Sequence, residues 1–413
     1  MNLYFTGHQE KYAVEQTMLT IFPQERPVYP DPAVTPPGGD NALELQFTRR
    51  PSWCTARAVL RREGKVYTRM CRVRTAALPA DDPVVATRLT RRTLQRAFYL
   101  AAIDCLGKEP PWGMLSGVRP VKLPTRAMEE GSTPRQAEAM LKHYHVSPVR
   151  RQLAMDCAQA SLAVKRSLQP EEISLYVGIP FCPTRCAYCS FISASGSANR
   201  LIPAYLDALF GEIDAAGEAA RRAGKTVRTV YIGGGTPTTL APDQLKALLD
   251  RLHTAFDLAP GTEFTVEAGR PDTITREKLE AIRDGGGNRI SVNPQTMSDL
   301  VLETIGRSHR AEDIRQAYAL AREVRVGAIN MDLIAGLPAD TPAGFAATLD
   351  EVIGMDPENI TVHTLALKKG ARLRQENVPL PSGEDVARML DFAWSALRAA
   401  GYRPYYLYRQ KFM

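Results

Sequence analysis

The sequence predicts an α/β protein in which a partial (β/α)6 barrel follows a smaller α+β domain. Beyond residue 170, short apolar strands alternate with amphipathic helices at similar spacing, which is typical of parallel strands joined by crossover helices. Six such units are fewer than the eight of a closed barrel. Before residue 170, strands precede a run of helices. We place the α+β domain with its helical tail at residues 1–168, the barrel at 172–370 and a helical extension at 371–413.

The first domain begins with elements typical of a small sheet. Alternating apolar residues around the turn "REGK" predict a β-hairpin over residues 53–73, and Pro and Gly predict a loop over residues 26–40. Helical spacing of apolar residues follows. In order, we expect the loop 26–40, a strand at 42–50, the hairpin at 53–73, and helices at 87–106, 132–145 and 147–168.

The charge of the chain is uneven. Residues 1–170 hold 25 Lys and Arg against 15 Asp and Glu, whereas the whole chain carries +7. Such an excess predicts either an ordinary solvated surface or a site for an acidic ligand or partner. No helix-turn-helix or zinc-finger pattern supports nucleic acid binding. Neither a secretory signal nor an apolar run near the roughly 18 residues of a membrane span is present, so we expect a cytoplasmic protein.

Polar residues stand at the carboxyl ends of the six strands predicted for the barrel. In barrels of this kind these ends form the functional site. The strands are expected at 174–180, 226–235, 263–269, 289–295, 327–338 and 359–367, and their ends carry a cysteine loop, Gly233-Gly234-Gly235-Thr236, Glu267, Asn293 with Gln295, Asp332 and His363.

The cysteine loop, "GIPFCPTRCAYCSF" at residues 178–191, places Cys182, Cys186 and Cys189 close together. Three thiolates can ligate three irons of an iron–sulfur cube and leave the fourth iron open. Structural zinc prefers four closed ligands, and only distant residues such as His253 or His309 could complete a zinc site. The odd total of seven cysteines disfavours a disulfide framework. The other four are expected to be core thiols: Cys54, Cys71, Cys105 and Cys157.

This loop resembles that of the radical S-adenosylmethionine (SAM) superfamily. The segments "YVGIPFCPTRCAYCSF", "YIGGGTPT", "TVEAGRPD", "NRISVNPQTM" and "MDLIAGLPADT" resemble the oxygen-independent coproporphyrinogen III oxidase family, and "PWGMLSGVRPVK" adds a likeness to its HemZ-type branch. The resemblance implies a [4Fe–4S] cluster and SAM as cofactors. It also implies a tetrapyrrole ligand, and an electron donor such as flavodoxin or ferredoxin.

The resemblance assigns roles to matching positions. The three cysteines would ligate the cluster, and the glycines would let the backbone approach SAM, although a plain strand-to-helix turn also explains them. Arg307 would hold the SAM carboxylate, although it is also typical of a surface helix. The SAM contacts implied are Tyr176, Tyr188, Gly234, Gly235, Thr236, Glu267, Gln295, Arg307, Asp332 and, near the adenine, Ala366.

Three functions are compatible with this resemblance. The first is oxidative decarboxylation of coproporphyrinogen III to protoporphyrinogen IX, with propionates held by cations such as Arg119, Lys122, Lys368 or Lys369. The others are haem carriage and radical methyl transfer to haem. The oxidase branch has a further cysteine just beyond the triad, in a Cys-x-Cys pattern, whereas here Cys189 is followed by Ser190-Phe191, which favours the carrier. The chain ends at "YYLYRQKFM", where family members continue, so a truncated and a naturally short form would look alike.

Overall fold

The computed structural model describes residues 1–31, 38–191, 193–368 and 370–409. Its contacts divide the chain into two compact units. Unit 1 holds Met1–Ser167 and the segment that starts at Pro404, and unit 2 holds Leu168–Arg403. Part of the predicted loop 26–40, namely residues 32–37, and the candidate cation Lys369 lie outside the described residues.

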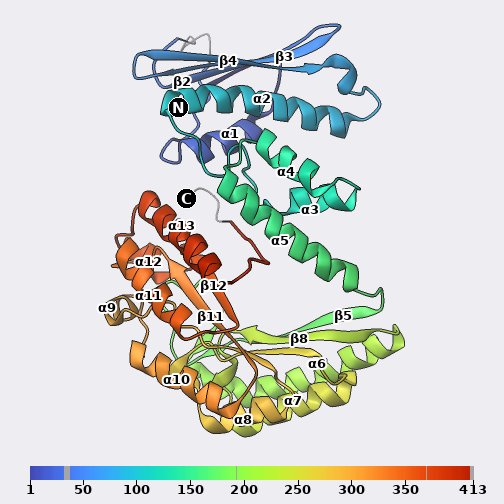
Figure 1. Cartoon of the computed structure of the whole chain (residues 1–413), viewed down its shortest axis with the longest axis vertical. Coiled ribbons are helices and arrows are strands. Elements are labelled where there is room, and N and C mark those ends of the chain that lie inside the picture. Colours follow the sequence, from blue (N-terminus) through green and yellow to red (C-terminus); the bar gives the residue numbers. More distant parts are fainter. Residues whose placement is uncertain (32–37, 192, 369, 410–413) are drawn as a thin grey trace. The chain divides into compact units, whose positions relative to one another are not determined.

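Unit 1 is built on a four-stranded sheet in the order β1-β2-β3-β4. The predicted hairpin is confirmed, because β3 and β4 pair antiparallel from Trp53 opposite Arg74 to Arg62 opposite Lys65. The sequence analysis missed β1, which pairs parallel with β2. Helices α1 and α2 cover one face and bury a shared apolar core with it (Figure 1). The bounds are β1 Asn2–Thr6, α1 Lys11–Ile21, β2 Ala42–Arg49, β3 Trp53–Arg62, β4 Lys65–Arg74 and α2 Pro83–Leu106.

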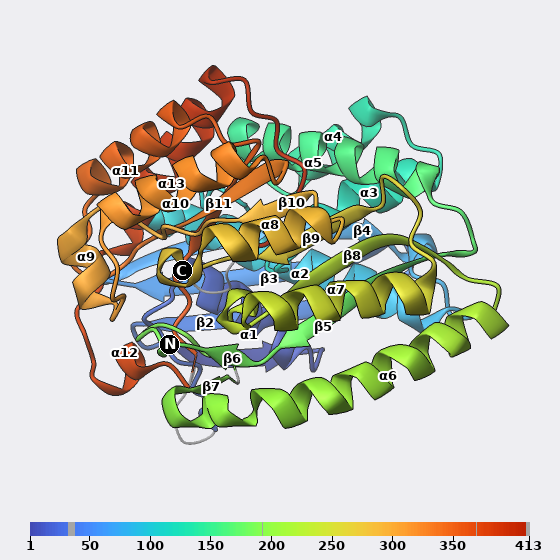
Figure 2. The same cartoon turned by 90° about the horizontal axis from the view of Figure 1, so that it is seen from below.

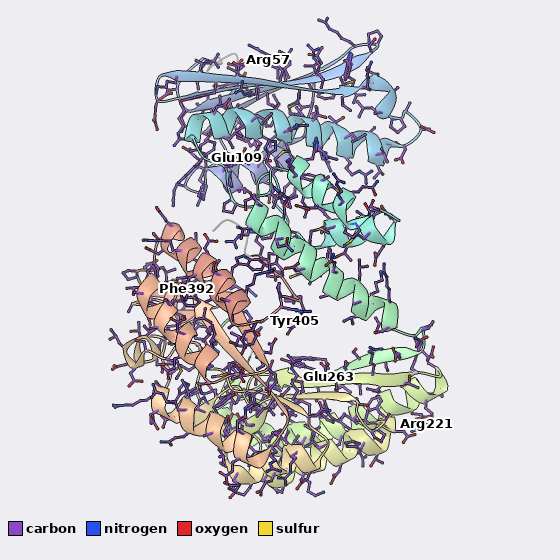
Figure 3. All side chains as sticks on the ribbon, viewed as in Figure 1. Arg57, Glu109, Arg221, Glu263, Phe392 and Tyr405 are labelled. Carbon is purple, nitrogen blue, oxygen red and sulfur yellow. The ribbon has the colours of Figure 1, made fainter. Side chains whose placement is uncertain are left out.

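The opposite face of this sheet carries basic side chains, among them Arg57 on β3 (Figure 3). A second, smaller core in unit 1 joins α3 Lys122–Glu129, α4 Pro134–His143 and α5 Pro148–Ser167. Trp112 packs against that core. The C-terminal segment also joins unit 1, because the Arg409 guanidinium donates to the carbonyl of Leu115 at 2.6 Å.

Unit 2 contains one six-stranded sheet in the order β12-β11-β10-β9-β8-β5, and all its pairs are parallel. Each strand predicted for the barrel is present, which confirms the predicted α/β fold with a parallel sheet. The strands are β5 Glu172–Ile179, β8 Thr226–Gly234, β9 Glu263–Glu267, β10 Arg289–Ser291, β11 Ala328–Ala335 and β12 Asn359–Thr364.

Strand alternation gives this sheet two different faces. Apolar side chains such as Val230, Ile232 and Leu333 point into a core with the crossover helices. Figures 1 and 2 show α6, α7, α8 and α10 along that face. The other face carries polar groups, including Tyr231 and Asp332. The helices are α6 Ile202–Arg222, α7 Pro242–Phe256, α8 Arg276–Asp284, α9 Asp299–Thr304, α10 Ala311–Val324, α11 Pro342–Gly354, α12 Arg372–Gln375 and α13 Gly383–Ala399.

The helices of the described residues include none with the length and apolar character of a membrane span.

Candidate active site

The cysteine loop follows β5 and is held by backbone hydrogen bonds at both ends. Its first part forms β6 (Phe181–Cys182), which pairs with β7 (Ala194–Ser195). In its second part, Ala187 donates to the carbonyl of Ile305 at 2.9 Å and accepts from Leu373 at 3.0 Å. All three cysteines are free thiols and partly exposed. A loop anchored in this way can present its sulfur atoms to one ligand.

The three thiols are not arranged around a single ion. Among the residues that the structure describes, no group of three His, Cys, Asp or Glu side chains is close enough to hold one metal ion. Burial raises the pKa of the Cys189 thiol, and the neighbouring Cys186 and Cys182 raise it further. Thiolates that bind three different irons of a cube lie farther apart than ligands of one ion, and binding would release their protons. Three thiols on one loop are a donor set of the kind that an iron–sulfur cluster takes.

The glycine run at the end of β8 packs directly against the start of the cysteine loop. The N–H groups of Gly235 and Thr236 donate to the carbonyls of Ile179 (2.8 Å) and Phe181 (2.7 Å). A Cβ on Gly235 would lie 2.5 Å from the Phe181 carbonyl oxygen. The Thr236 hydroxyl lies 3.5 Å from the Cys182 sulfur. Gly235 and Thr236 thus have a structural role, because they hold the start of the cysteine loop. The predicted contact with SAM would be a second role.

Glu267 at the end of β9 lies beside this run. Its carboxyl accepts a hydrogen bond from the Tyr231 hydroxyl and another from the Gly234 N–H. Burial raises the pKa of Glu267, and the nearby Asp332 adds to that shift. The oxygens of a carboxyl can accept further hydrogen bonds, which suits a ribose hydroxyl. The Tyr231 ring in turn stacks on that of Tyr176, with centroids 6.0 Å apart.

Asp332 on β11 connects this group to β12. One carboxylate oxygen accepts from the Asn330 amide at 2.8 Å, and the other lies 3.7 Å from His363 Nε2. The hydrogen bond with Asp332 raises the pKa of His363. The polar face thus carries two acids near each other, an arrangement that attracts a cation such as the sulfonium or ammonium of SAM.

Gln295 is held between β10 and β11 in a conformation that is uncommon for a residue with a side chain. Its φ is +69°, in the left-handed region. Backbone bonds fix it there, since its N–H donates to the Asp332 carbonyl at 2.9 Å and its carbonyl accepts from Ile334 at 3.0 Å. Such backbone strain is concentrated at functional sites.

Arg307 contacts the cysteine loop directly. Its Nη2 donates to the Tyr188 hydroxyl at 3.0 Å, and its Nη1 lies 3.5 Å from the Gly269 carbonyl. Its Nε is buried and has no hydrogen-bond partner among the described residues. A carboxylate would accept a hydrogen bond from this unsatisfied guanidinium N–H beside the loop. The residues present therefore fit both a cluster and SAM.

The other residues predicted to contact SAM or substrate do not join this group of interacting side chains. Ala366 lies two residues beyond β12 and makes none of the polar contacts described above. Lys368 is exposed in unit 2, and Arg119 and Lys122 are exposed in unit 1. Cys54 and Cys157 are buried, as expected for core thiols, whereas Cys71 and Cys105 are half-buried.

Sequence reasoning did not single out two residues that the structure places at the site. Tyr231 alternates with the apolar Val230 and Ile232 and therefore faces Glu267, so its period-2 position was a usable signal. Arg270 follows β9 and is buried beside the cysteine loop. An arginine directly after a strand end was a weaker signal.

Comparison with known proteins gives the class of this site. Residues 176–352 match the Radical SAM superfamily. Coproporphyrinogen III oxidase (HemN) from Escherichia coli, described as a radical SAM enzyme, shares the fold with a TM-score of 0.53 and 31% identity, over 59% of this chain and 56% of that one. Unit 2 is thus a radical SAM domain, whose cofactors are a [4Fe–4S] cluster and SAM.

The chain is more specifically similar to proteins related to the oxygen-independent coproporphyrinogen III oxidases. It is 38% identical over 308 residues to an oxygen-independent coproporphyrinogen-III oxidase-like protein, HemZ, from Bacillus subtilis, which is 73% of this chain and 61% of the relative. It is 33% identical over 237 residues to the heme chaperone HemW of the same organism, 56% of this chain and 62% of that one. The chain therefore spans about three fifths of the length of these relatives.

Proposed function

We propose that this protein is a radical SAM enzyme that oxidatively decarboxylates propionates of coproporphyrinogen III. The observation that carries the proposal is the extent of the similarity. The match to the HemZ relative covers 308 residues, far more than the 176–352 segment of the superfamily. The match to the chaperone is shorter, at 237 residues. The longer similarity to the oxidase-like relative therefore supports the enzyme.

Different residues of the site would bind the cluster and the separate groups of SAM. Cys182, Cys186 and Cys189 would hold the cluster, and Arg307 would hold the SAM carboxylate with its unpaired Nε. Glu267 would bind a ribose hydroxyl while Asp332 stabilises the positive charge of SAM. The sheet and its helices would keep water from the reacting groups.

When bound, the cluster and SAM would supply a one-electron cleavage that yields a 5′-deoxyadenosyl radical. Each propionate would lose one hydrogen atom from its β-carbon to this radical. Release of CO₂ and transfer of one electron to an acceptor would then leave a vinyl group. The chain's part in this step is to hold the propionate within reach of the SAM site, with the exposed Lys368 in unit 2 as one candidate cation.

A haem-carrying function is the second candidate, and one observation favours it. The oxidase branch has a further cysteine two residues after the triad, whereas here Cys189 is followed by Ser190-Phe191. A carrier would bind haem without changing it. It would therefore leave coproporphyrinogen III intact.

One anaerobic experiment separates the two. Reconstituted protein is incubated with SAM, a reductant and either coproporphyrinogen III or haem, and the porphyrins are analysed by mass spectrometry. If the protein is the enzyme, the product should differ from coproporphyrinogen III by the loss of two CO₂ and four hydrogen atoms. Unchanged coproporphyrinogen III together with stoichiometric haem binding would instead establish the carrier.

A further inference from the structure

Arg270 occupies an unusual position for a charged side chain, because it is only 3% exposed. It lies between the end of β9 and a short 3-10 turn at Pro271–Thr273. Burying a guanidinium is unfavourable unless its donors are satisfied. The contacts that satisfy this one come from three separate segments of unit 2.

Each nitrogen of the Arg270 guanidinium has a partner. Nε and Nη2 donate to the two carboxylate oxygens of Asp272 at 3.0 and 2.8 Å. Nη2 also donates to the Ser308 hydroxyl at 3.0 Å. Nη1 donates to the carbonyl and hydroxyl oxygens of Thr184 at 3.0 and 2.8 Å. This fork geometry is specific to arginine, since lysine has a single point of charge.

Thr184 places these contacts inside the cysteine loop. It stands between Cys182 and Cys186 in the segment "CPTRC", so Arg270 fixes the part of the loop that separates two sulfur atoms. The same Nη1 lies 4.0 Å from the Cys186 sulfur. A positive charge therefore lies next to a thiol assigned to the cluster.

The charges around Arg270 define what this group can do. Although burial raises the pKa of Asp272, the hydrogen bonds and charge of Arg270 lower it overall, so the pair is ionised at neutral pH. Burial and the charge of Arg307 lower the pKa of His309 to about 4. His309 is therefore neutral at pH 7, whereas the charges of Arg270 and Arg307 both act on Cys186, and Arg270 Nη1 lies 4.0 Å from its sulfur.

We propose that Arg270 is a positioning residue for the cluster, which holds the loop through Thr184 and raises the reduction potential through its charge beside Cys186. This inference rests on the proposed cluster site. Adding an electron makes a cluster more negative, so a nearby cation stabilises the reduced form, and N–H groups directed at sulfur act in the same sense. Asp272 opposes this effect because it compensates the charge of Arg270.

Two substitutions should shift the potential in opposite directions. In Arg270→Gln the charge and the fork are lost, so the midpoint potential should become more negative. In Asp272→Asn the cation remains and its counter-charge is lost, so the potential should become more positive. Arg310→Gln, at an exposed residue next to His309, is the control and should leave the potential unchanged.

The test is a potentiometric titration of the reconstituted cluster followed by electron paramagnetic resonance, with iron content measured on each sample. A negative shift for Arg270→Gln with a positive shift for Asp272→Asn supports the inference. Equal potentials, or shifts of the same sign, overturn it. If Arg270→Gln does not retain iron, the sign of the Asp272→Asn shift decides. Absence of a cluster from the unsubstituted protein would instead refute the cluster site itself.

Discussion

The carboxylate of Asp332 lies 3.7 Å from Nε2 of His363 on the neighbouring strand, while its other oxygen accepts from Asn330. The pair joins β11 and β12 on the polar face of the sheet, where His363 aligns with Ile334. The Asp332 carboxylate favours the charged imidazolium and raises the pKa of His363, although burial acts in the opposite sense. His363 thus reports directly on the charge of a proposed SAM contact.

Replacing Asp332 by Asn should lower the pKa of His363. Because the folded-state pKa is raised, the stabilisation from this pair is fully present below the unfolded-state value and is lost as the pH rises through the folded-state pKa. An NMR titration of the imidazole C–H signals measures the shift. The signals of His253, which lies on α7 and contacts the Gly285 carbonyl, are the internal reference. An unaltered His363 pKa in Asp332→Asn would show that the two groups do not interact.

Arg307→Ala should weaken SAM binding without removing the cluster. Loss of one charge-assisted hydrogen bond costs about 1.5–3 kcal/mol, which corresponds to a decrease in affinity of roughly ten- to a hundredfold. Anaerobic calorimetry on the reconstituted protein measures the affinity, and the visible absorbance reports the cluster. Arg310→Ala is the matched control. Equal affinity for SAM in the two variants would exclude Arg307 from the site.

Gly235→Ala should destabilise unit 2, because its Cβ would lie 2.5 Å from the Phe181 carbonyl oxygen. Overpacking of this kind costs about 1–3 kcal/mol in free energy of unfolding. Gly211→Ala is the control, since Gly211 lies in helix α6 with open space around it. That substitution should stabilise the protein by about 0.5–1 kcal/mol. Urea denaturation of both variants gives the comparison, and equal effects would contradict the packing described here.

Replacing Cys182, Cys186 and Cys189 together by Ala should abolish cluster binding. The triple variant should lose the broad visible absorbance of an iron–sulfur protein and its bound iron, and with them any SAM cleavage. Cys54→Ala and Cys157→Ala, at buried thiols in unit 1, should retain the cluster. If the triple variant still bound about four irons, the cysteine loop would not be the cluster site.

The sequence allowed the parallel sheet and the strand-end residues to be predicted together. Parallel strands bring their carboxyl ends to one edge, so Glu267 and Asp332 were expected near each other before the fold was known. The structure places them within electrostatic reach. The hairpin at 53–73 was predictable for a similar reason, because the alternation and the turn lie within one short segment.

Other features depend on contacts between distant segments. Strand β1 pairs with β2 across about 40 residues, and such pairing leaves no local pattern. Helix α1 did have a signal, since Ala13, Val14 and Met18 are buried at helical spacing. Arg270 had only a weak signal, because its partners Thr184 and Ser308 are 86 and 38 residues away.

The most direct test of the central claim is transfer of hydrogen from substrate to SAM-derived product. Coproporphyrinogen III deuterated at the propionate β-carbons is incubated anaerobically with the reconstituted protein, SAM and a reductant. Mass spectrometry then measures deuterium in 5′-deoxyadenosine and vinyl groups in the porphyrin. We expect 5′-deoxyadenosine that carries deuterium, formed together with the decarboxylated porphyrin. Unlabelled 5′-deoxyadenosine beside intact coproporphyrinogen III would contradict the proposed decarboxylation.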